Sequence, residues 1–295
     1  MRSKILGEEK VRQAPSAFGL ELLALKFFFI NLCVIILSIM ARIICVTNQK
    51  GGVGKTTTAV NLGYYLAKDK FKTLLIDFDP QGNATSGLGI EKNQDNFGPT
   101  MTDVLLKTAM IEQVIRPTKY KNFDLAPTTP ELANAEVEIT TQPRKFTRLR
   151  DAISRIEGNY DYIIIDLPPS LSLLTVNGMI ASHYLLLPVQ TEFYALEGVA
   201  QLLESMNLVK KAMNPKLQLL GVLATMYDRR TVLSSQTLAE LKRFFKDKVF
   251  ETTIPRNVRL AEAPSHGVAI GQYDRFSKGA KAYKALADEV LERAK

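Results

Sequence analysis

The chain has 295 residues, of which 46% are hydrophobic and 23% are charged, a balance typical of a globular protein with a large core. Its formal net charge of +8 favours a polyanionic partner, and the basic excess persists when residues 1–39 are left out. Only two cysteines occur, Cys33 and Cys45, which excludes a disulfide framework and a cysteine-rich metal centre and favours a reducing compartment.

Residues 20–40 form a strongly apolar stretch that is long enough to cross a bilayer. It could be a membrane anchor, a signal peptide or an upstream extension that precedes the working chain. We favour the extension, because Met40 is followed almost at once by the first predicted strand, which leaves no linker to cross the headgroup region. We therefore expect an apolar extension at 1–39, outside the functional domain, and a single domain over 40–295.

A glycine-rich segment at 48–58 follows a short apolar run typical of a buried strand. It precedes a segment whose apolar residues recur at helical spacing. Strand, glycine loop and helix in this order form the setting of a phosphate-binding loop, in which backbone N–H groups surround phosphate oxygens. Lys55 would then contact the β- and γ-phosphates, and the Thr56 hydroxyl would bind Mg²⁺. The expected nucleotide-binding residues of the loop are Lys50, Gly51, Gly52, Val53, Gly54, Lys55, Thr56 and Thr57.

Two further predicted strands end in aspartates. The run at 73–79 ends in Asp77 and Asp79, and the apolar run at 160–166 ends in Asp166. Because parallel strands bring their carboxyl ends to the same edge of a sheet, these carboxylates should lie beside the phosphate loop. Asp166 is expected to hold Mg²⁺ directly or through water. Of Asp77 and Asp79, one would help to hold Mg²⁺ through water and the other would orient the attacking water. The alternative is that each aspartate only caps the turn that follows its strand.

The rest of the chain continues to alternate between strand and helix patterns. Strands are predicted at 122–127, 184–189, 219–226 and 249–254, and helices at 196–212 and 281–295. This alternation predicts an α/β fold with a mostly parallel, twisted sheet flanked by helices.

Two of the predicted strand-end loops are rich in arginine: Arg229 and Arg230 lie in the first, and Arg256 and Arg259 in the second. They could form one basic surface. Because no recognition-helix or base-stacking pattern accompanies them, such a surface would contact phosphates and not bases. On charge alone, an ordinary solvated surface is the alternative.

From Met40 onward the chain resembles the ParA/Soj chromosome- and plasmid-partition ATPases, which belong to the ParA/MinD group of P-loop NTPases with a deviant Walker A loop. In this loop Gln49 stands where the common pattern has a glycine, and Lys50 is an added lysine. The resemblance rests on four motifs: Lys50-Gly51-Gly52-Val53-Gly54-Lys55-Thr56-Thr57, Asp77-Phe78-Asp79-Pro80-Gln81-Gly82-Asn83, Asp166-Leu167-Pro168-Pro169 and Ile254-Pro255-Arg256-Asn257-Val258-Arg259.

The resemblance implies a weak ATPase that uses ATP and Mg²⁺ and forms a homodimer when ATP binds. Lys50 would reach the nucleotide of the partner subunit, and Lys55 would contact the nucleotide of its own subunit. Asp79 would serve hydrolysis, and Pro255 and Asn257 would line the adenine pocket.

The family also implies partners. Arg230 and Arg259 match the arginines with which the ATP-bound dimer holds DNA without sequence preference. A ParB-like partition protein would stimulate hydrolysis, and cycles of binding and release would move chromosome or plasmid DNA. Such a protein would be cytoplasmic and associated with the nucleoid.

Two other functions share this fold. A MinD-like positioning ATPase would act on a membrane, but only the apolar stretch at 20–40 favours it, since the helix at 281–295 is expected to dock on its own domain. An electron donor like the nitrogenase iron protein needs cysteine ligands at the dimer interface. Cys33 precedes the domain and Cys45 lies in the first core strand, so neither can serve.

Overall fold

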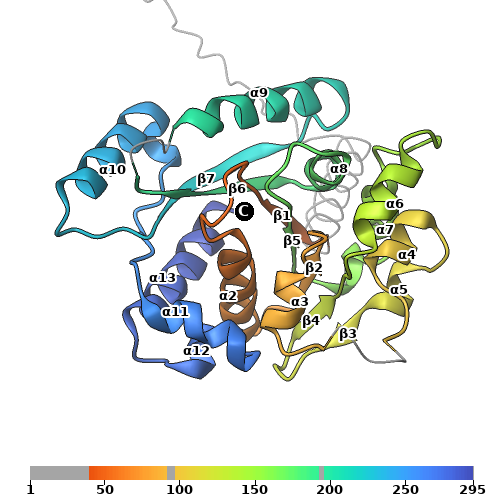
Figure 1. The fold of residues 1–295 in the computed structure, drawn as a ribbon, viewed down its shortest axis with the longest axis horizontal. Helices are drawn as coiled ribbons and strands as arrows, with labels where there is room; N and C mark the ends of the chain where they lie inside the picture. Colours follow the sequence, from red (N-terminus) through yellow and green to blue (C-terminus); the bar gives the residue numbers. More distant parts are fainter. Residues whose placement is uncertain (1–39, 92–96, 193–195, 295) are drawn as a thin grey trace, which may run out of the picture. The chain divides into compact units, whose positions relative to one another are not determined.

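The computed structural model describes residues 40–91, 97–192 and 196–294. The N-terminal extension predicted at 1–39 lies outside the described residues, and its role stays a prediction. The described residues from 41 onward form one compact unit (Figure 1). Within the described part of the chain, no helix combines the length and the apolar character that crossing a membrane requires.

A seven-stranded sheet in the order β3-β4-β2-β5-β1-β6-β7 forms the centre of this unit. All neighbouring strands are parallel except β3 and β4. The predicted α/β fold with a mostly parallel sheet is therefore confirmed. The strands are β1 (Arg42–Val46), β2 (Thr73–Asp77), β3 (Arg116–Pro117), β4 (Phe123–Ala126), β5 (Tyr162–Asp166), β6 (Tyr184–Gln190) and β7 (Gln218–Thr225).

Helices cover both faces of the sheet (Figure 1). Successive residues of β1 alternate between two hydrophobic cores, with Ile43 and Cys45 in one and Ile44 and Val46 in the other. Both faces of the strand are thus buried, as in other parallel sheets. The described α-helices are α2 (Lys55–Lys68), α3 (Asn83–Gly87), α4 (Met101–Leu106), α5 (Ile111–Val114), α6 (Leu132–Ile139), α7 (Arg148–Ile153), α8 (Leu173–Ala181), α9 (Glu197–Ala212), α10 (Val232–Phe245), α11 (Val258–Glu262), α12 (Ile270–Tyr273) and α13 (Lys278–Arg293).

The C-terminal helix α13 docks on its own domain, as the sequence predicts. It packs against α2, and its apolar residues Tyr283, Leu286 and Val290 are almost fully buried. The Tyr283 hydroxyl also lies 3.2 Å from the Thr58 hydroxyl of α2. The apolar face of α13 is therefore covered by protein.

The prediction of a strand at 249–254 is wrong. This segment runs beside β7 but makes only isolated bridges, at Val249 and Pro255. The reason is a side chain: the Glu289 carboxylate of α13 accepts hydrogen bonds from the backbone N–H groups of Glu251 (2.9 Å) and Thr252 (3.1 Å). Because these donors bond to a carboxylate, they are not part of a ladder.

Candidate functional site

The glycine loop between β1 and α2 is held in an open, preformed shape. Gly52 and Gly54 have φ angles of +76° and +88°, a conformation that residues with a side chain rarely adopt. A Cβ added at Gly52 would have no other atom within 4 Å, so space is left over the loop. The Asn48 side chain fixes the start of the loop, because it donates to the Pro188 carbonyl (2.6 Å) and accepts from the Lys50 N–H (2.9 Å).

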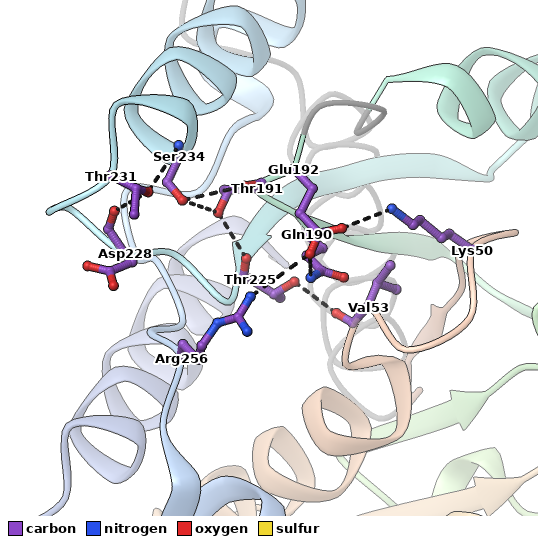
Figure 2. Close-up of polar contacts among 10 residues, drawn as sticks. All are labelled: Lys50, Val53, Gln190, Thr191, Glu192, Thr225, Asp228, Thr231, Ser234 and Arg256. Atoms are coloured by element: carbon purple, nitrogen blue, oxygen red, sulfur yellow. Dashed lines mark hydrogen bonds and ion pairs between the residues drawn. The ribbon is translucent and has the colours of Figure 1, made fainter.

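The two lysines of the loop lie in different surroundings. Lys55 is 7% exposed, and its ammonium donates to the Lys50 carbonyl at 3.1 Å. Burial lowers the pKa of Lys55, while Asp166 and Asp79 favour its charged form. The Lys50 side chain is 43% exposed and forms an ion pair with Glu192 at 3.3 Å, as Figure 2 shows. Only Lys55 is therefore held inside the loop of its own chain.

Asp166 provides the two unpartnered oxygens that a divalent cation would need. Asp166 is paired in register with Asp77 at the ends of β5 and β2. Both Asp166 carboxylate oxygens are buried without a hydrogen-bond partner. Burial raises the pKa of Asp166 well above its ordinary value and the charge of Asp77 adds to this, while the nearby Thr56 hydroxyl and Lys55 oppose it. Buried, unpartnered carboxylate oxygens are the hard ligands that Mg²⁺ prefers, so these residues fit the metal.

Asp77 differs from Asp166 because its carboxylate is already engaged. One oxygen accepts from the Thr85 N–H (2.7 Å) and from the Thr85 hydroxyl (2.6 Å) of α3. Burial raises the pKa of Asp77 to about 6, against the pull of these hydrogen bonds. Asp77 thus anchors α3 beside the loop, and any contribution to the metal would be indirect.

Asp79 lies in the turn between β2 and α3 and is 6% exposed. Its carboxylate accepts from the Gln81 N–H at 3.0 Å. The charge of Asp79 favours the charged form of Lys55, so Asp79 lies within electrostatic range of the lysine that would contact the phosphates. Asp77, Asp79 and Asp166 thus meet at the edge of the sheet that carries the loop, and their individual roles stay predictions.

A mainly apolar cavity of about 340 Å³ lies next to the loop. Gly54 and Thr57 line it from the loop side, and Pro255 and Asn257 line it from the segment before α11. Asn257 also caps α11, since its side-chain oxygen accepts from the Arg259 N–H at 2.8 Å. The position of this cavity suits the flat base of a nucleotide whose phosphates occupy the loop.

Only some of the arginines predicted to form a basic surface lie together. Arg229, Arg230 and Arg256 line one cavity of about 560 Å³, whereas Arg259 is not among the residues that line it. Arg230 is exposed, but its guanidinium makes two parallel contacts with Asp228, at 2.9 and 2.7 Å. These contacts hold the pKa of Asp228 far below its usual range.

Arg259 is also paired in this structure. Its guanidinium lies 2.9 Å from Glu262 and 3.8 Å from Asp274. An anion that binds Arg230 or Arg259 therefore competes with a carboxylate of the chain itself.

Two residues of the site are not predicted by the sequence. The Thr225 hydroxyl, at the end of β7, donates to the Val53 carbonyl at 2.8 Å and ties the loop to this strand (Figure 2). Glu192, just after β6, lies between Lys50 and Arg256, at 3.3 and 3.9 Å. Glu192 is 142 positions from Lys50 in the sequence, so no local pattern signals the contact.

Known proteins resemble the chain over most of its length. A model of the AAA domain family matches residues 41–219. The sporulation initiation inhibitor protein Soj of Bacillus subtilis is 52% identical over 85% of this chain and 98% of its own. The chromosome partitioning protein ParA of Myxococcus xanthus is 49% identical over 86% of this chain and 89% of its own. A similar fold occurs in a crystal structure described as cobyrinic acid a,c-diamide synthase from Mycobacterium smegmatis with bound ADP and magnesium. Its sequence is 35% identical to this chain, and the match has a TM-score of 0.75. The match covers 86% of this chain and 95% of the other.

The parallel sheet, the two-lysine loop and the buried aspartates define the class, a P-loop ATPase with a deviant Walker A loop. ATP and Mg²⁺ are the substrate and the metal of this class. Within it, the chain belongs to the ParA/Soj family of chromosome-partitioning ATPases.

Proposed function

We propose that this ATPase dimerises when it binds ATP, holds DNA without sequence preference as a dimer, and releases it after hydrolysis. A ParB-like partition protein would accelerate the hydrolysis, so that repeated cycles move or space DNA cargo on the nucleoid. The observation that carries the proposal is the separation of the two loop lysines. Lys55 is enclosed by its own loop, whereas Lys50 projects outward to an exposed carboxylate, where a second subunit could receive it.

The residues around the loop have distinct parts in this cycle. Lys55 and the backbone N–H groups of the loop would bind the phosphates, and Asp79 would orient the attacking water. Asp166 and Thr56 would hold Mg²⁺, which neutralises charge on the phosphates when bound. Asp77 would keep α3 and the Asp79 turn in place, since its carboxylate bonds to Thr85.

A mixing experiment tests whether Lys50 acts on the partner. Lys50→Ala and Asp79→Ala should each be inactive alone. In a mixed dimer the Asp79→Ala subunit supplies Lys50 to a site that retains Asp79. An equal mixture should therefore recover up to about one quarter of the wild-type ATPase rate, because half of the dimers are mixed and each has one complete site. A Lys50 that serves its own subunit would give no recovery at any ratio.

A second experiment tests DNA binding. Arg230→Glu should still dimerise with ATP but should lose ATP-dependent retention on random-sequence DNA, because a phosphate contact becomes a repulsion. Asp79→Ala should bind ATP, dimerise and remain on DNA, since it fails only in hydrolysis. Unchanged retention of Arg230→Glu in a gel-shift assay would remove the basic surface from the proposal.

Membrane positioning has less support as a function. The helix that could act as an amphipathic anchor, α13, buries Tyr283, Leu286 and Val290 against the domain. Residues 20–39 of the apolar stretch lie outside the described residues. Electron transfer has no ligand set among the described residues, since Cys45 is buried in β1 and burial raises the pKa of its thiol to about 12.

A further inference from the structure

A hollow of about 610 Å³ lies apart from the nucleotide loop, where the end of α2 meets the turn between β3 and β4. We name it the lysine–tyrosine hollow. Two segments about 50 residues apart in sequence supply its charged side chains. Its basic residues are Lys68, Lys70, Lys119 and Lys121, and its rings are Tyr64 and Tyr120.

All four lysines are exposed. No described carboxylate lies within 4 Å of any of them, although Asp69 stands between Lys68 and Lys70 in the sequence. Asp69 is occupied by Lys284, at 3.1 Å. The four ammonium groups therefore concentrate positive charge at one place, and an anion that binds there has no internal ion pair to break. Arg230 and Arg259 differ in this respect, because each is held by a carboxylate.

The floor of the hollow is aromatic and fixed. The rings of Tyr64 and Tyr120 pack edge to face with their centroids 4.9 Å apart. Lys68 and Lys119 lie over these rings at 5.8 and 5.9 Å. The Tyr120 hydroxyl accepts a hydrogen bond from the Ala269 N–H at 2.9 Å, which joins the floor to the start of α12. The lysines thus extend from a rigid base.

The hollow is close to the surface that carries Arg259. The helix α12 contacts both α2 and α11 (Figure 1). The Tyr120 hydroxyl bonds to the N–H group of Ala269, the residue just before α12. At the other end of α12, the Arg259 guanidinium lies 5.9 Å from the ring centroid of Tyr273, the last residue of the helix. A four-residue helix is about 6 Å long, and a DNA duplex presents a phosphate charge about every 1.7 Å of its axis. One duplex could therefore contact both surfaces.

We infer that the lysine–tyrosine hollow is a second phosphate-binding surface that extends the DNA contact of the proposed function. The inference rests on that function and adds to it a set of contacts remote from Arg230. The lining residues favour nucleic acid over a membrane or a protein partner, because none is an exposed large apolar side chain of the kind that anchors such partners.

The test compares two fourfold variants of the full chain that remove the same charge. The hollow variant carries Lys68→Gln, Lys70→Gln, Lys119→Gln and Lys121→Gln. The control carries Lys107→Gln, Lys210→Gln, Lys211→Gln and Lys248→Gln, four exposed lysines that also lack ion pairs within the described residues. Affinity for random-sequence duplex DNA is measured with ATP over a series of salt concentrations. Basal ATPase activity without DNA checks that both variants are folded.

The hollow variant should lose more than tenfold in affinity at low salt. Its plot of log affinity against log salt should be shallower by about 0.9 for each phosphate contact removed. The control should show a much smaller change. Equal losses in both variants, or an unchanged DNA affinity of the hollow variant, would overturn the inference and leave the proposed function standing. A wild-type chain that binds no DNA with ATP would overturn both.

Discussion

Arg230 is exposed to solvent and yet held in place by a neighbour. Its guanidinium and the Asp228 carboxylate are only two positions apart and meet through two parallel contacts. Such a paired arrangement fixes the direction of the side chain while it cancels its charge. In the proposed cycle, the phosphate of DNA competes with Asp228 for the same donors.

Asp228→Asn should therefore strengthen DNA binding. The substitution removes the competing charge and keeps the arginine at position 230. We therefore expect a severalfold higher affinity for DNA in the ATP state and a salt slope steeper by about 1. Gel shifts at several salt concentrations measure both quantities. Asp247→Asn is the matched control, because it changes the net charge equally at an exposed residue outside this cluster. Equal gains in the two variants would mean that Asp228 does not restrain Arg230.

Glu192 restrains the other functional cation, Lys50. In the proposed cycle this ion pair must open before Lys50 can reach a second subunit, so Glu192→Gln should favour the dimer. Exposed ion pairs contribute up to about 1 kcal/mol, so the ATP concentration for half-maximal dimerisation should fall by at most about fivefold. Light scattering against ATP concentration measures this, with Glu204→Gln as control. A higher requirement for ATP would show that Glu192 aids dimerisation.

At the scale of elements, the packing of α8 determines where the segment after β5 can lie. Leu167 directly follows Asp166 and is fully buried. A Cβ at Gly178 of α8 would lie 2.5 Å from a Leu167 methyl carbon, closer than real Cβ contacts allow. The absence of a side chain at Gly178 therefore lets the helix pack directly on the residue that follows Asp166.

Gly178→Ala should accordingly destabilise the fold and disturb the site. Overpacking of this kind costs about 1–3 kcal/mol, which urea unfolding measures. The ATPase rate should fall as well, since a displaced Leu167 shifts Asp166. Gly158→Ala is the control, because a Cβ there meets nothing within 4 Å. A Gly178→Ala protein with wild-type stability and activity would show that Leu167 can move without effect.

The sequence predicts those elements and site residues that depend on residues close together in the chain. The glycine loop and the strand-end aspartates follow from adjacent residues and from the shared edge of parallel strands, which is why their placement could be expected. The segment at 249–254 has the composition of a strand, but the Glu289 carboxylate takes its donors from 38 and 37 positions away. Glu192 and Thr225 reach the loop because β6 lies next to β1 in the sheet and β7 lies next to β6.

At the scale of the whole molecule, the two buried aspartates link stability to pH. Burial raises the pKa of Asp77 to about 6 and that of Asp166 in the same direction, whereas an unfolded aspartate titrates near 3.9. Between about pH 4 and 6 the folded state therefore binds more protons than the unfolded state. The contribution of this pair to the free energy of unfolding is greatest at acid pH and falls as the pH rises through this window.

Asp166→Asn should thus stabilise the ligand-free protein at pH 7.5, because burial disfavours the charged form of the Asp166 carboxylate and the amide carries no charge. We expect a Tm higher by a few degrees, and a smaller difference at pH 5. The same variant should lose the rise in Tm that ATP with Mg²⁺ gives the wild type, because a metal ligand is missing. Thermal scans at both pH values, with and without ATP and Mg²⁺, measure all of these effects. A lower ligand-free Tm at pH 7.5 would contradict the argument.

The hydrogen bond from Thr225 to Val53 bears on how the molecule conveys the state of its nucleotide. It fastens the phosphate loop to the strand whose end leads directly to Asp228 and Arg230, and both atoms are buried. This hydrogen bond therefore connects the nucleotide site to the loop that carries Asp228 and Arg230. In the proposed cycle, the affinity for DNA then depends on how many subunits are joined. It does not depend on a change of shape within one subunit.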